Sequence, residues 1–433
     1  MSDRLPIAII GAGPVGLAAA AHLLVRGERP LVLEAGPAVG HAVAQWAHVR
    51  LFTPWRYCLD GAARRLLEAS GWQAPPEEEI PTGRDLIARY LAPLGALLAP
   101  HITLNARVSA ITRQGADKAK DAGRAGRPFL LRIGEEEVVA ARAVIDASGT
   151  WFTPSPAGAD GLPALGERRA AARVQYGIPG ILGAERARHA GRHTVVLGGG
   201  HSALNSLIDL ATLAREAPAT RITWLMRKAT VEAAFGGEGA DALAARGALG
   251  SAARSLVESG TVTVRSPFLV EAVRETGAGL VIEGAGGTRV EADELIVATG
   301  FRPDLAPLSE LRLALDPALD CAAKLGPLID PNIHSCGTVR PHGAAELAHP
   351  EPGFYIAGMK SYGRAPTFLL ATGHEQVRSI AAALAGDAEA AARVELELPE
   401  TGVCNTGPVT RQRVSVTAAT GCCAPQPKPA CCG

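Results

Sequence analysis

Three glycines near the N-terminus constrain this chain more than any other feature: Gly11, Gly13 and Gly16 form a G-x-G-x-x-G pattern. The short apolar run 7–10 precedes them, and an Ala- and Leu-rich run follows them and ends at Gly27. In such a strand–turn–helix unit the first glycine permits a tight turn and the second lets the backbone approach a pyrophosphate. The third allows the helix to pack closely on the strand. Because a helix N-terminus also offers free N–H groups and partial positive charge, the pattern predicts a dinucleotide-binding unit.

The next predicted strand, residues 31–34, ends in an acid. Glu34 follows the first glycine by roughly 20 residues, where the ribose of a dinucleotide needs a hydrogen-bond acceptor. We therefore expect Glu34 and Ala35 to contact the sugar, and Pro14 and Val15 to lie against the pyrophosphate with the glycines.

A second copy of the pattern begins with a predicted strand at residues 192–197. It continues through Gly198, Gly200, His201 and Ser202 to Ala203, which replaces the third glycine. The following strand, residues 222–226, ends in Arg227 and Lys228 instead of an acid. Since an acid suits a free 2′-hydroxyl and an arginine accommodates a 2′-phosphate, this copy is predicted to prefer NADPH. The alternative is that both cations belong to a solvated edge.

Composition limits the class of protein. A chain of 433 residues favours two domains, and 47% hydrophobic with 20% charged residues is ordinary for a soluble enzyme. A formal net charge of +0 gives no reason to expect nucleic acid or an anionic membrane as a partner. Glycines interrupt the apolar run 5–25, and it lacks a basic leader and a cleavage site, so we expect a cytoplasmic protein.

Several further segments bear on the site. Residues 51–58 are rich in aromatic side chains, which either line a flat ring system or pack on the sheet. A predicted strand over 102–111 is followed by a solvated hairpin tip over 115–128. Residues 138–145 form another strand that ends in small residues near Gly149, suited to a close approach by a cofactor. Residues 151–163 are predicted to be a linker, and 368–384 an apolar helix.

Taken together, these motifs resemble those of the two-domain FAD/NAD(P)H flavoproteins over about residues 5–395. The resemblance implies an α/β fold with two Rossmann-like, three-layer (ββα/βαβ) dinucleotide-binding domains, the second inserted in the first, and a flexible Cys-rich tail. We assign residues 1–155 and 301–395 to the FAD domain, 156–300 to the NADPH domain and 396–433 to the tail. In this family a position like Val108 meets the adenine, and the turns at Gly149, Gly300 and Gly358 lie at the cofactors. Met359 stands where the family usually has Asp.

Within that family the chain is most similar to the branch of flavin-containing monooxygenases. The Gln45–Trp46 pair and the second glycine turn fit that branch, whereas the disulfide reductases need a redox cysteine pair that is missing from residues 1–395. The resemblance implies hydride transfer from NADPH to FAD, then to O2 and a small-molecule substrate. Candidates for the flavin face are Trp46, His342, Lys360, Tyr362 and Arg364. The alternative for each is a packing or surface residue.

The tail carries clustered thiols: Cys404, Cys422, Cys423, Cys431 and Cys432. Thiolates select thiophilic ions, and such tails resemble those of flavoproteins associated with arsenic or heavy-metal resistance. The alternatives are cysteines without a role, or a disulfide shuttle to the flavin of a partner subunit in a homodimer. A reductase using tail thiols, and a flavin- and thiol-bearing sensor or metal carrier, thus stand beside the monooxygenase hypothesis.

Overall fold

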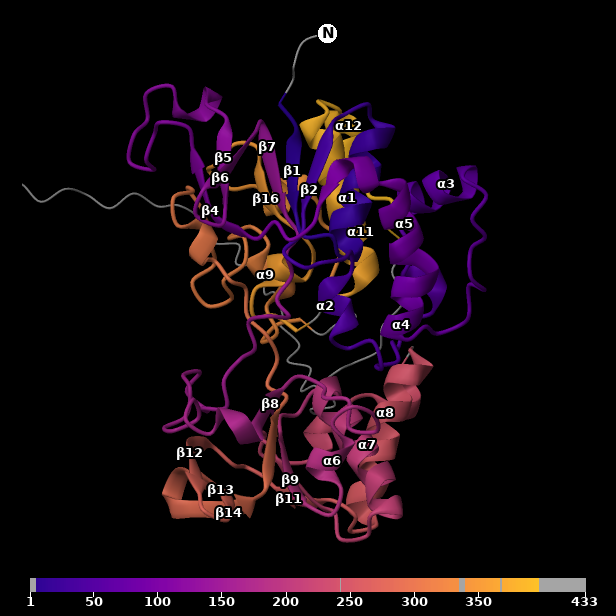
Figure 1. Ribbon diagram of the computed structural model, residues 1–433, viewed down its shortest axis with the longest axis vertical. Helices are drawn as coiled ribbons and strands as arrows, with labels where there is room; N and C mark the ends of the chain where they lie inside the picture. The colour runs from indigo at the N-terminus through magenta and orange to yellow at the C-terminus, as the bar shows by residue number, and fades with distance from the viewer. Residues whose placement is uncertain (1–4, 242, 335–338, 367, 397–433) are drawn as a thin grey trace, which may run out of the picture.

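The computed structural model describes residues 5–241, 243–334, 339–366 and 368–396. Figure 1 shows them in two lobes, with the first and last described segments in the upper lobe and the middle segment in the lower one. Among the described residues, no helix is both long and apolar enough to cross a bilayer.

A five-stranded parallel sheet forms the centre of the upper lobe. Its order is β16–β7–β1–β2–β3, with β1 (Ile7–Ile10), β2 (Pro30–Leu33), β3 (Ile102–Thr103), β7 (Ala143–Asp146) and β16 (Phe354–Ile356). Ile7 and Ile9 of β1 face one hydrophobic cluster and Ala8 faces another, so the central strand is buried on both sides. Such a two-sided burial explains why the strand sequence is continuously apolar.

Helices cover one face of this sheet, chiefly α1 (Pro14–Val25) and α11 (Leu370–Leu384). Ala18 to Ala21 of α1 and Ala381 to Ala382 of α11 are fully buried, and these small side chains let the two helices pack closely. The antiparallel sheet β4 (Val108–Arg113), β5 (Phe129–Ile133) and β6 (Glu137–Ala141) covers the other face. The remaining helices are α2 (His41–Ala44), α3 (Gly61–Ala69), α4 (Gly83–Leu86), α5 (Ala92–Leu97), α9 (Gly326–Ile329), α10 (Ala344–Leu347) and α12 (Ala388–Ala392).

The lower lobe repeats this three-layer plan. Its parallel sheet has the order β11–β10–β9–β15–β8, with β8 (Val174–Tyr176), β9 (His193–Leu197), β10 (Arg221–Leu225), β11 (Thr263–Arg265) and β15 (Glu294–Val297). Alternate residues of β9 again face opposite layers, because Val196 packs towards α7 and Val195 towards an antiparallel sheet. The helices are α6 (Arg186–His189), α7 (His201–Glu216) and α8 (Ala244–Glu258), and the antiparallel strands are β12 (Val270–Thr276), β13 (Gly279–Gly284) and β14 (Thr288–Ala292).

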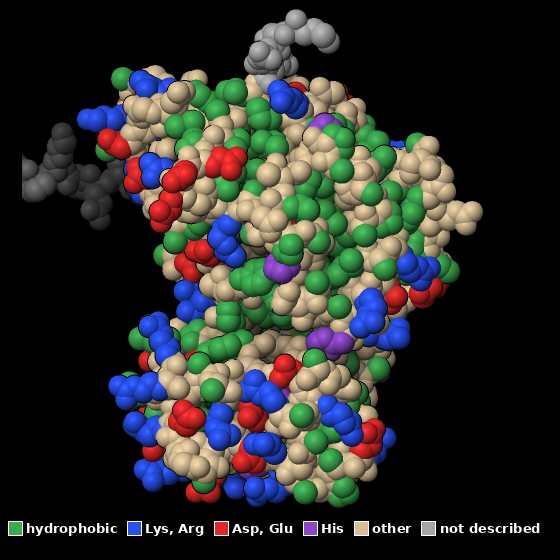
Figure 2. Space-filling model, viewed as in Figure 1, with side chains coloured by type: hydrophobic (Ala, Val, Ile, Leu, Met, Phe, Trp, Pro, Cys, Tyr) green, Lys and Arg blue, Asp and Glu red, His purple; other side chains and the backbone are tan. Residues whose placement is uncertain are grey.

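The chain passes between the lobes twice, and the two passages pair with each other. The Ser155 N–H donates to the Gly300 carbonyl at 2.8 Å, and the Arg302 N–H donates to the Thr153 carbonyl at 2.9 Å. Figure 2 shows hydrophobic side chains continuing through the waist at this level. The predicted fold, an α/β chain with the second dinucleotide-binding unit inserted in the first, is confirmed.

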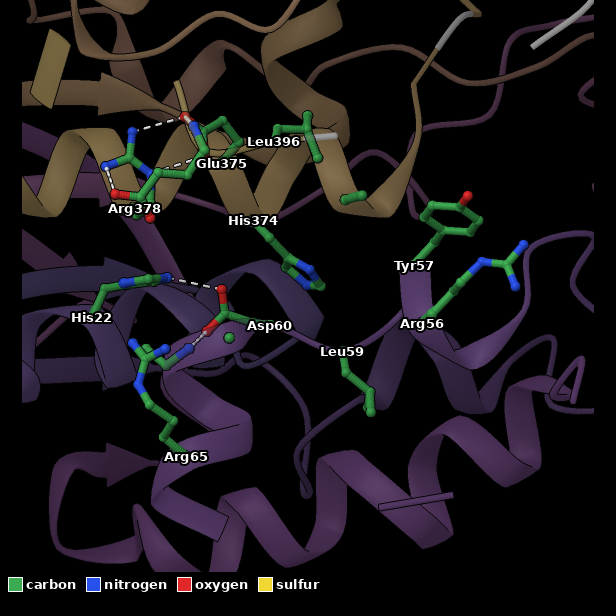
Figure 3. Close-up of a pocket in the computed structure, with 14 residues that line it drawn as sticks. His22, Arg56, Tyr57, Leu59, Asp60, Arg65, His374, Glu375, Arg378 and Leu396 are labelled. Carbon is green, nitrogen blue, oxygen red and sulfur yellow. Dashed lines mark hydrogen bonds and ion pairs between the residues drawn. The ribbon is translucent and has the colours of Figure 1, made fainter. Parts of the chain in front are cut away.

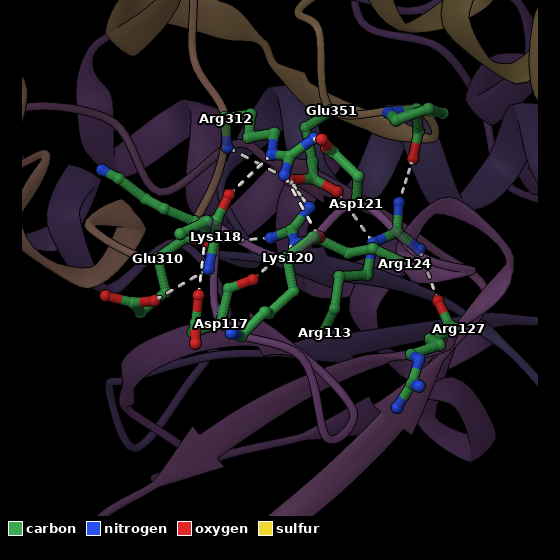
Figure 4. Close-up of polar contacts among 12 residues, drawn as sticks. Arg113, Asp117, Lys118, Lys120, Asp121, Arg124, Arg127, Glu310, Arg312 and Glu351 are labelled. Atoms are coloured by element: carbon green, nitrogen blue, oxygen red, sulfur yellow. Dashed lines mark hydrogen bonds and ion pairs between the residues drawn. The ribbon is translucent and has the colours of Figure 1, made fainter.

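Two local predictions differ from the structure. The strand expected over 102–111 is broken into β3 and β4, because Asn105 adopts a left-handed conformation with φ +56° between them. The tip over 115–128 is not simply solvated: Arg124 is buried and forms an ion pair with Glu351, which also pairs with Arg113 at 2.8 Å (Figure 4). These contacts hold the tip against the segment before β16, where the chain has come back to the upper lobe.

Candidate cofactor-binding and active site

The first glycine turn joins β1 to α1 at the carboxyl edge of the upper sheet. Gly11 has φ +97°, and a Cβ there would lie 2.8 Å from the Ala147 carbonyl oxygen. A Cβ on Gly16 would lie 1.9 Å from the Gly11 carbonyl oxygen, so only glycine fits there. Gly13 instead faces open space, with no atom within 4 Å of its Cβ position. This geometry fits the three roles that the spacing predicts: a tight turn, an open approach and close packing.

Glu34 lies at this same turn, at the end of β2. Its Oε2 accepts the Ala12 N–H at 2.6 Å and its Oε1 accepts the Gly36 N–H at 2.7 Å. A carboxylate can accept about four hydrogen bonds, and Glu34 accepts two within the protein. Its oxygens can therefore still accept hydrogen bonds from ribose hydroxyls. The Glu34 carbonyl accepts the Ala106 N–H at 2.7 Å, which brings the start of β4 and Val108 beside the predicted sugar position.

The ends of β7 and β16 form the other side of this edge. Lys360 is buried and its Nζ donates to Asp146 Oδ2 at 2.7 Å and to Ser148 Oγ at 3.1 Å. Gly149, with φ +71° and nothing within 4 Å of its Cβ position, leaves this edge open. Lys360, expected at the flavin face, therefore joins the two strand ends beneath the cofactor turn.

A polar chain from α11 supports the late turn at Gly358. The Gly358 N–H donates to Gln376 Oε1 at 2.8 Å, and Gln376 Nε2 donates to Ser361 Oγ at 2.9 Å and lies 2.8 Å from His342 Nε2. His342 Nδ1 lies 3.1 Å from the Arg340 carbonyl, which can only accept, so Nδ1 carries the proton and Nε2 accepts from Gln376. Burial lowers the pKa of His342, which keeps this arrangement neutral.

The other flavin-face candidates occupy varied positions. Tyr362 is buried with its ring 5.5 Å from that of His342, and Met359 is half-buried beside Gly358. Arg364 is on the surface in an ion pair with Asp320. Their assignment to the flavin remains a prediction.

The second glycine turn joins β9 to α7 and repeats the first one in outline. Gly198 has φ +139°, and a Cβ there would lie 2.3 Å from the Ala298 carbonyl oxygen, as Gly11 lies against Ala147. Gly200 again faces open space. Ala203 is fully buried, so this turn has room for the methyl group that Gly16 could not carry. Gly300, with φ +95°, is open in the same way as Gly149.

Two cations, Arg227 and Lys228, follow β10, the strand next to β9, and Lys228 lies at the second turn. The stem of Lys228 lies 3.5 Å from the Cβ position of Gly199, and its Nζ donates to the Ala233 carbonyl. Arg227 is exposed and makes no ion pair with any described residue. Burial, with nearby Arg246 and Lys228, lowers the pKa of His201, so this first residue of α7 is neutral at pH 7.

Aromatic rings meet where the two lobes join. Trp151 stacks on Phe301 with centroids 4.9 Å apart, and Trp46 lies 6.5 Å from Trp151. Phe52, from the aromatic segment 51–58, lies 5.4 Å from His201 of the lower lobe. The segment therefore reaches across the lobes towards the second turn as well as packing on the upper lobe.

Both glycine turns fit the phosphates of a dinucleotide. Neither α1 nor α7 has a side-chain cap at its N-terminus, and both begin at a glycine whose Cβ position is open. Their N-terminal N–H groups are thus left for an anion. An FAD held by the first turn would supply the chemistry of accepting a hydride and passing electrons on.

The part of the chain that the structure describes has few groups suited to thiol or metal chemistry. Cys58 and Cys321 are free and buried; burial raises their pKa values to about 11 and about 12, so both are protonated at neutral pH. Within the described ranges no group of three or more His, Cys, Asp or Glu could hold a metal ion. The predicted thiol ligands Cys404, Cys422, Cys423, Cys431 and Cys432 lie outside the described residues.

Sequence reasoning missed the supports of the first site. Asp146 and Gln376 hold the strand ends and the late turn, yet neither belongs to a glycine motif. The available signal was the polar run His374 to Arg378 inside an otherwise apolar helix. Polar residues in such a stripe are buried only when they have partners.

Comparisons with known proteins agree with this geometry. Residues 8–322 match the family model described as pyridine nucleotide-disulphide oxidoreductase. The chain is 28% identical over 313 residues to a ferredoxin–NADP reductase of Salinispora arenicola, covering 72% of this chain and 79% of that protein.

Two solved structures illustrate the shared fold. The bacillithiol disulfide reductase Bdr of Bacillus cereus has a TM-score of 0.66 at 19% identity, covering 89% of this chain and 99% of that one. A mutant form of a flavin monooxygenase from Stenotrophomonas maltophilia has a TM-score of 0.59 at 21% identity, with the same coverage. The two nested cradles and the family match lead to one conclusion: the chain belongs to the pyridine nucleotide-disulphide oxidoreductase family and is an FAD- and NAD(P)H-dependent oxidoreductase.

Proposed function

We propose that this protein is an NADPH-driven monooxygenase that oxidises a small soft nucleophile. The observation that carries the proposal is the state of its described thiols. Cys58 and Cys321 are buried and protonated, so neither can relay electrons as a thiolate at neutral pH. Among the described residues no thiolate is thus available to relay electrons, which supports an acceptor that takes them directly from the flavin. The exposed Arg227 after β10 supports NADPH as the donor.

The aromatic rings at the lobe junction support the same reading. Trp46, Trp151 and Phe301 bring apolar surface together where the two lobes join. Exclusion of water from that space protects reactive species from wasteful hydrolysis, which an oxygenase requires.

The test uses NADPH consumption against arsenite, organoarsenicals, amines, thiols and disulfides, followed by mass spectrometry under ¹⁸O2. We expect NADPH oxidation to need oxygen and one labelled oxygen atom to enter the product. The same turnover without oxygen, or a product without label, contradicts the proposal. Replacing the five tail cysteines by serine is the control for a thiol relay: the proposal requires unchanged turnover.

A second candidate is transfer of electrons to an iron–sulfur carrier protein. The likeness to proteins named ferredoxin–NADP reductase favours it. Anaerobic reduction of a ferredoxin by NADPH, at a rate above that with any small molecule of the panel, would select this candidate over the oxygenase. Negligible NADPH oxidation with every acceptor would favour the sensor.

A further inference from the structure

A cavity of about 510 Å³ lies between α1, α3 and α11 of the upper lobe. Figure 3 shows its lining, with His22 from α1, Arg65 from α3 and His374 from α11 around it. None of the lining residues belongs to either glycine turn, so the cavity is separate from the positions of both dinucleotides.

The carboxylates of this cavity already have partners. Asp60 Oδ1 accepts the Ala62 and Ala63 N–H groups at 2.9 Å each, and its Oδ2 lies 2.8 Å from His22 Nε2. Glu375 accepts two hydrogen bonds from Arg378, at 2.7 and 2.8 Å. The acidic side of the lining is thus satisfied within the protein.

The hydrogen-bond donors of the lining have fewer partners within the protein. Arg65 is exposed at the rim and makes no hydrogen bond or ion pair with any described residue. Arg56 is paired only with Glu78, whose side chain is 76% exposed, and such surface pairs are weak. His374 is 7% exposed, its ring projects into the cavity, and its Nε2 has no hydrogen-bond partner among the described residues (Figure 3).

An unpartnered buried nitrogen costs free energy unless a ligand or water satisfies it. Burial lowers the pKa of His374 to about 4, so the ring is neutral at pH 7 and can donate one hydrogen bond. Arg65 and Arg56 lie on either side of this donor in Figure 3, and two guanidinium groups with a neutral imidazole are donors of the kind that recognise an oxyanion.

Glu395 also lines the cavity and pairs with Arg378 and Arg393 at 3.5 Å each, and the rest of the lining is apolar. Leu59, Ala371, Leu396 and the ring of Tyr57 complete the wall. A volume of about 510 Å³ also exceeds the needs of a bare inorganic ion and falls in the range of small-molecule sites. We propose that the cavity binds an organic oxyanion, a carboxylate or a phosphate monoester with an apolar body, held by Arg65, Arg56 and His374.

The cavity is connected to the FAD site through one helix. On α11, His374 faces the cavity, whereas the neighbouring Gly373 lies against Val15 of the first glycine turn and Gln376 holds Gly358. A ligand in the cavity would therefore contact the same helix that supports the first glycine turn and the turn at Gly358.

Calorimetric titration of the full-length, FAD-loaded protein tests the site, with benzoate, phenyl phosphate and neutral benzamide as probes. We expect one equivalent of benzoate, phenyl phosphate or both to bind, and benzamide to bind at least about tenfold more weakly. Arg65→Gln should weaken anion binding about tenfold or more. The matched control is Arg64→Gln, because Arg64 lies on the same helix but pairs with Glu68 and Glu77 outside the cavity.

The two anions separate a carboxylate from a phosphate ligand, and either one supports the proposal. Binding that persists with saturating NADPH also supports it, since the cavity shares no residue with the turns. No heat with either anion, equal affinity for benzamide, or equal losses in the two arginine variants would overturn it. None of these readouts depends on oxygenation, so the site and the proposed function can fail separately.

Discussion

Gly13 and Gly16 differ in what surrounds the position of a side chain, although they belong to one motif. A Cβ on Gly13 would meet nothing within 4 Å, and its φ of −79° suits any residue. A Cβ on Gly16 would strike the Gly11 carbonyl. We therefore expect Gly13 to be needed for ligand binding and Gly16 for the fold.

This contrast predicts opposite phenotypes. Gly16→Ala should destabilise the protein by about 1–3 kcal/mol through overpacking. Gly13→Ala should leave the stability of the flavin-free protein within about 0.5 kcal/mol but weaken FAD binding strongly, because its methyl group occupies the pyrophosphate approach. Urea unfolding of flavin-free protein and FAD titration by fluorescence measure the two effects. A Gly13→Ala protein with normal FAD affinity would refute the assignment.

At the residue scale, Arg227 is predicted to set the preference for NADPH over NADH. Loss of a charge-assisted contact with a 2′-phosphate is worth about 1.5–3 kcal/mol, so Arg227→Ala should lower kcat/KM for NADPH about tenfold or more and leave NADH nearly unchanged. Arg221→Ala is the control, because Arg221 is exposed at the opposite end of the same strand. Equal losses with both coenzymes would assign Arg227 to a solvated edge.

The glycine roles could be predicted from spacing because each depends on backbone within a few residues or on a motif of fixed geometry. The Lys360–Asp146 ion pair could not, because its partners are 214 positions apart and meet only when β7 and β16 lie side by side. Lys360 is a candidate for the flavin face by residue type alone. Its burial and its ion pair with Asp146 could not be predicted from the sequence, and a contact with the flavin stays a prediction.

At the scale of elements, Glu351 ties the tip over 115–128 to the core. Burial alone would raise its pKa, but hydrogen bonds from Arg124, Arg113 and the Arg312 N–H lower it below the ordinary value. A carboxyl whose folded-state pKa is lowered stabilises the fold above its unfolded pKa, about 4.3, and this stability is lost as pH falls through the folded-state value.

Glu351→Gln should therefore cost about 3–5 kcal/mol at pH 7, because two buried guanidinium groups lose their counter-charge. The difference from the wild type should shrink as the pH falls below about 4. Urea unfolding between pH 3 and pH 8 measures both, with Glu310→Gln as a control, since Glu310 is exposed in the same cluster. A constant difference across that range would contradict this account.

Helices and strands could be predicted where the spacing of apolar residues is regular. The helix expected over 368–384 corresponds to α11. The strand expected over 102–111 failed because alternation of apolar residues continues through Asn105, whose left-handed backbone no hydrophobic pattern reveals. The Lys- and Asp-rich composition of the tip over 115–128 predicts a solvated segment. Its burial of Arg124 depends on tertiary contacts that composition does not reveal.

For the whole molecule, each lobe has its own core. The described hydrophobic clusters contain residues of one lobe or the other and none that joins both. Scanning calorimetry should accordingly show two unfolding transitions. NADP⁺ at about 100 times its Kd should stabilise the lower lobe by about 2.7 kcal/mol, and FAD should raise the other transition. A single transition raised equally by both ligands would show that the lobes unfold together.

The pairing of Ser155 with Gly300 has a consequence for how such chains diversify. Ser155 and Gly300 are joined by a direct backbone hydrogen bond. Removing the segment between them would therefore leave two chain ends that a very short loop could connect. We therefore expect that the inserted segment can be exchanged between relatives, changing which electron donor is accepted while the upper lobe keeps its own packing.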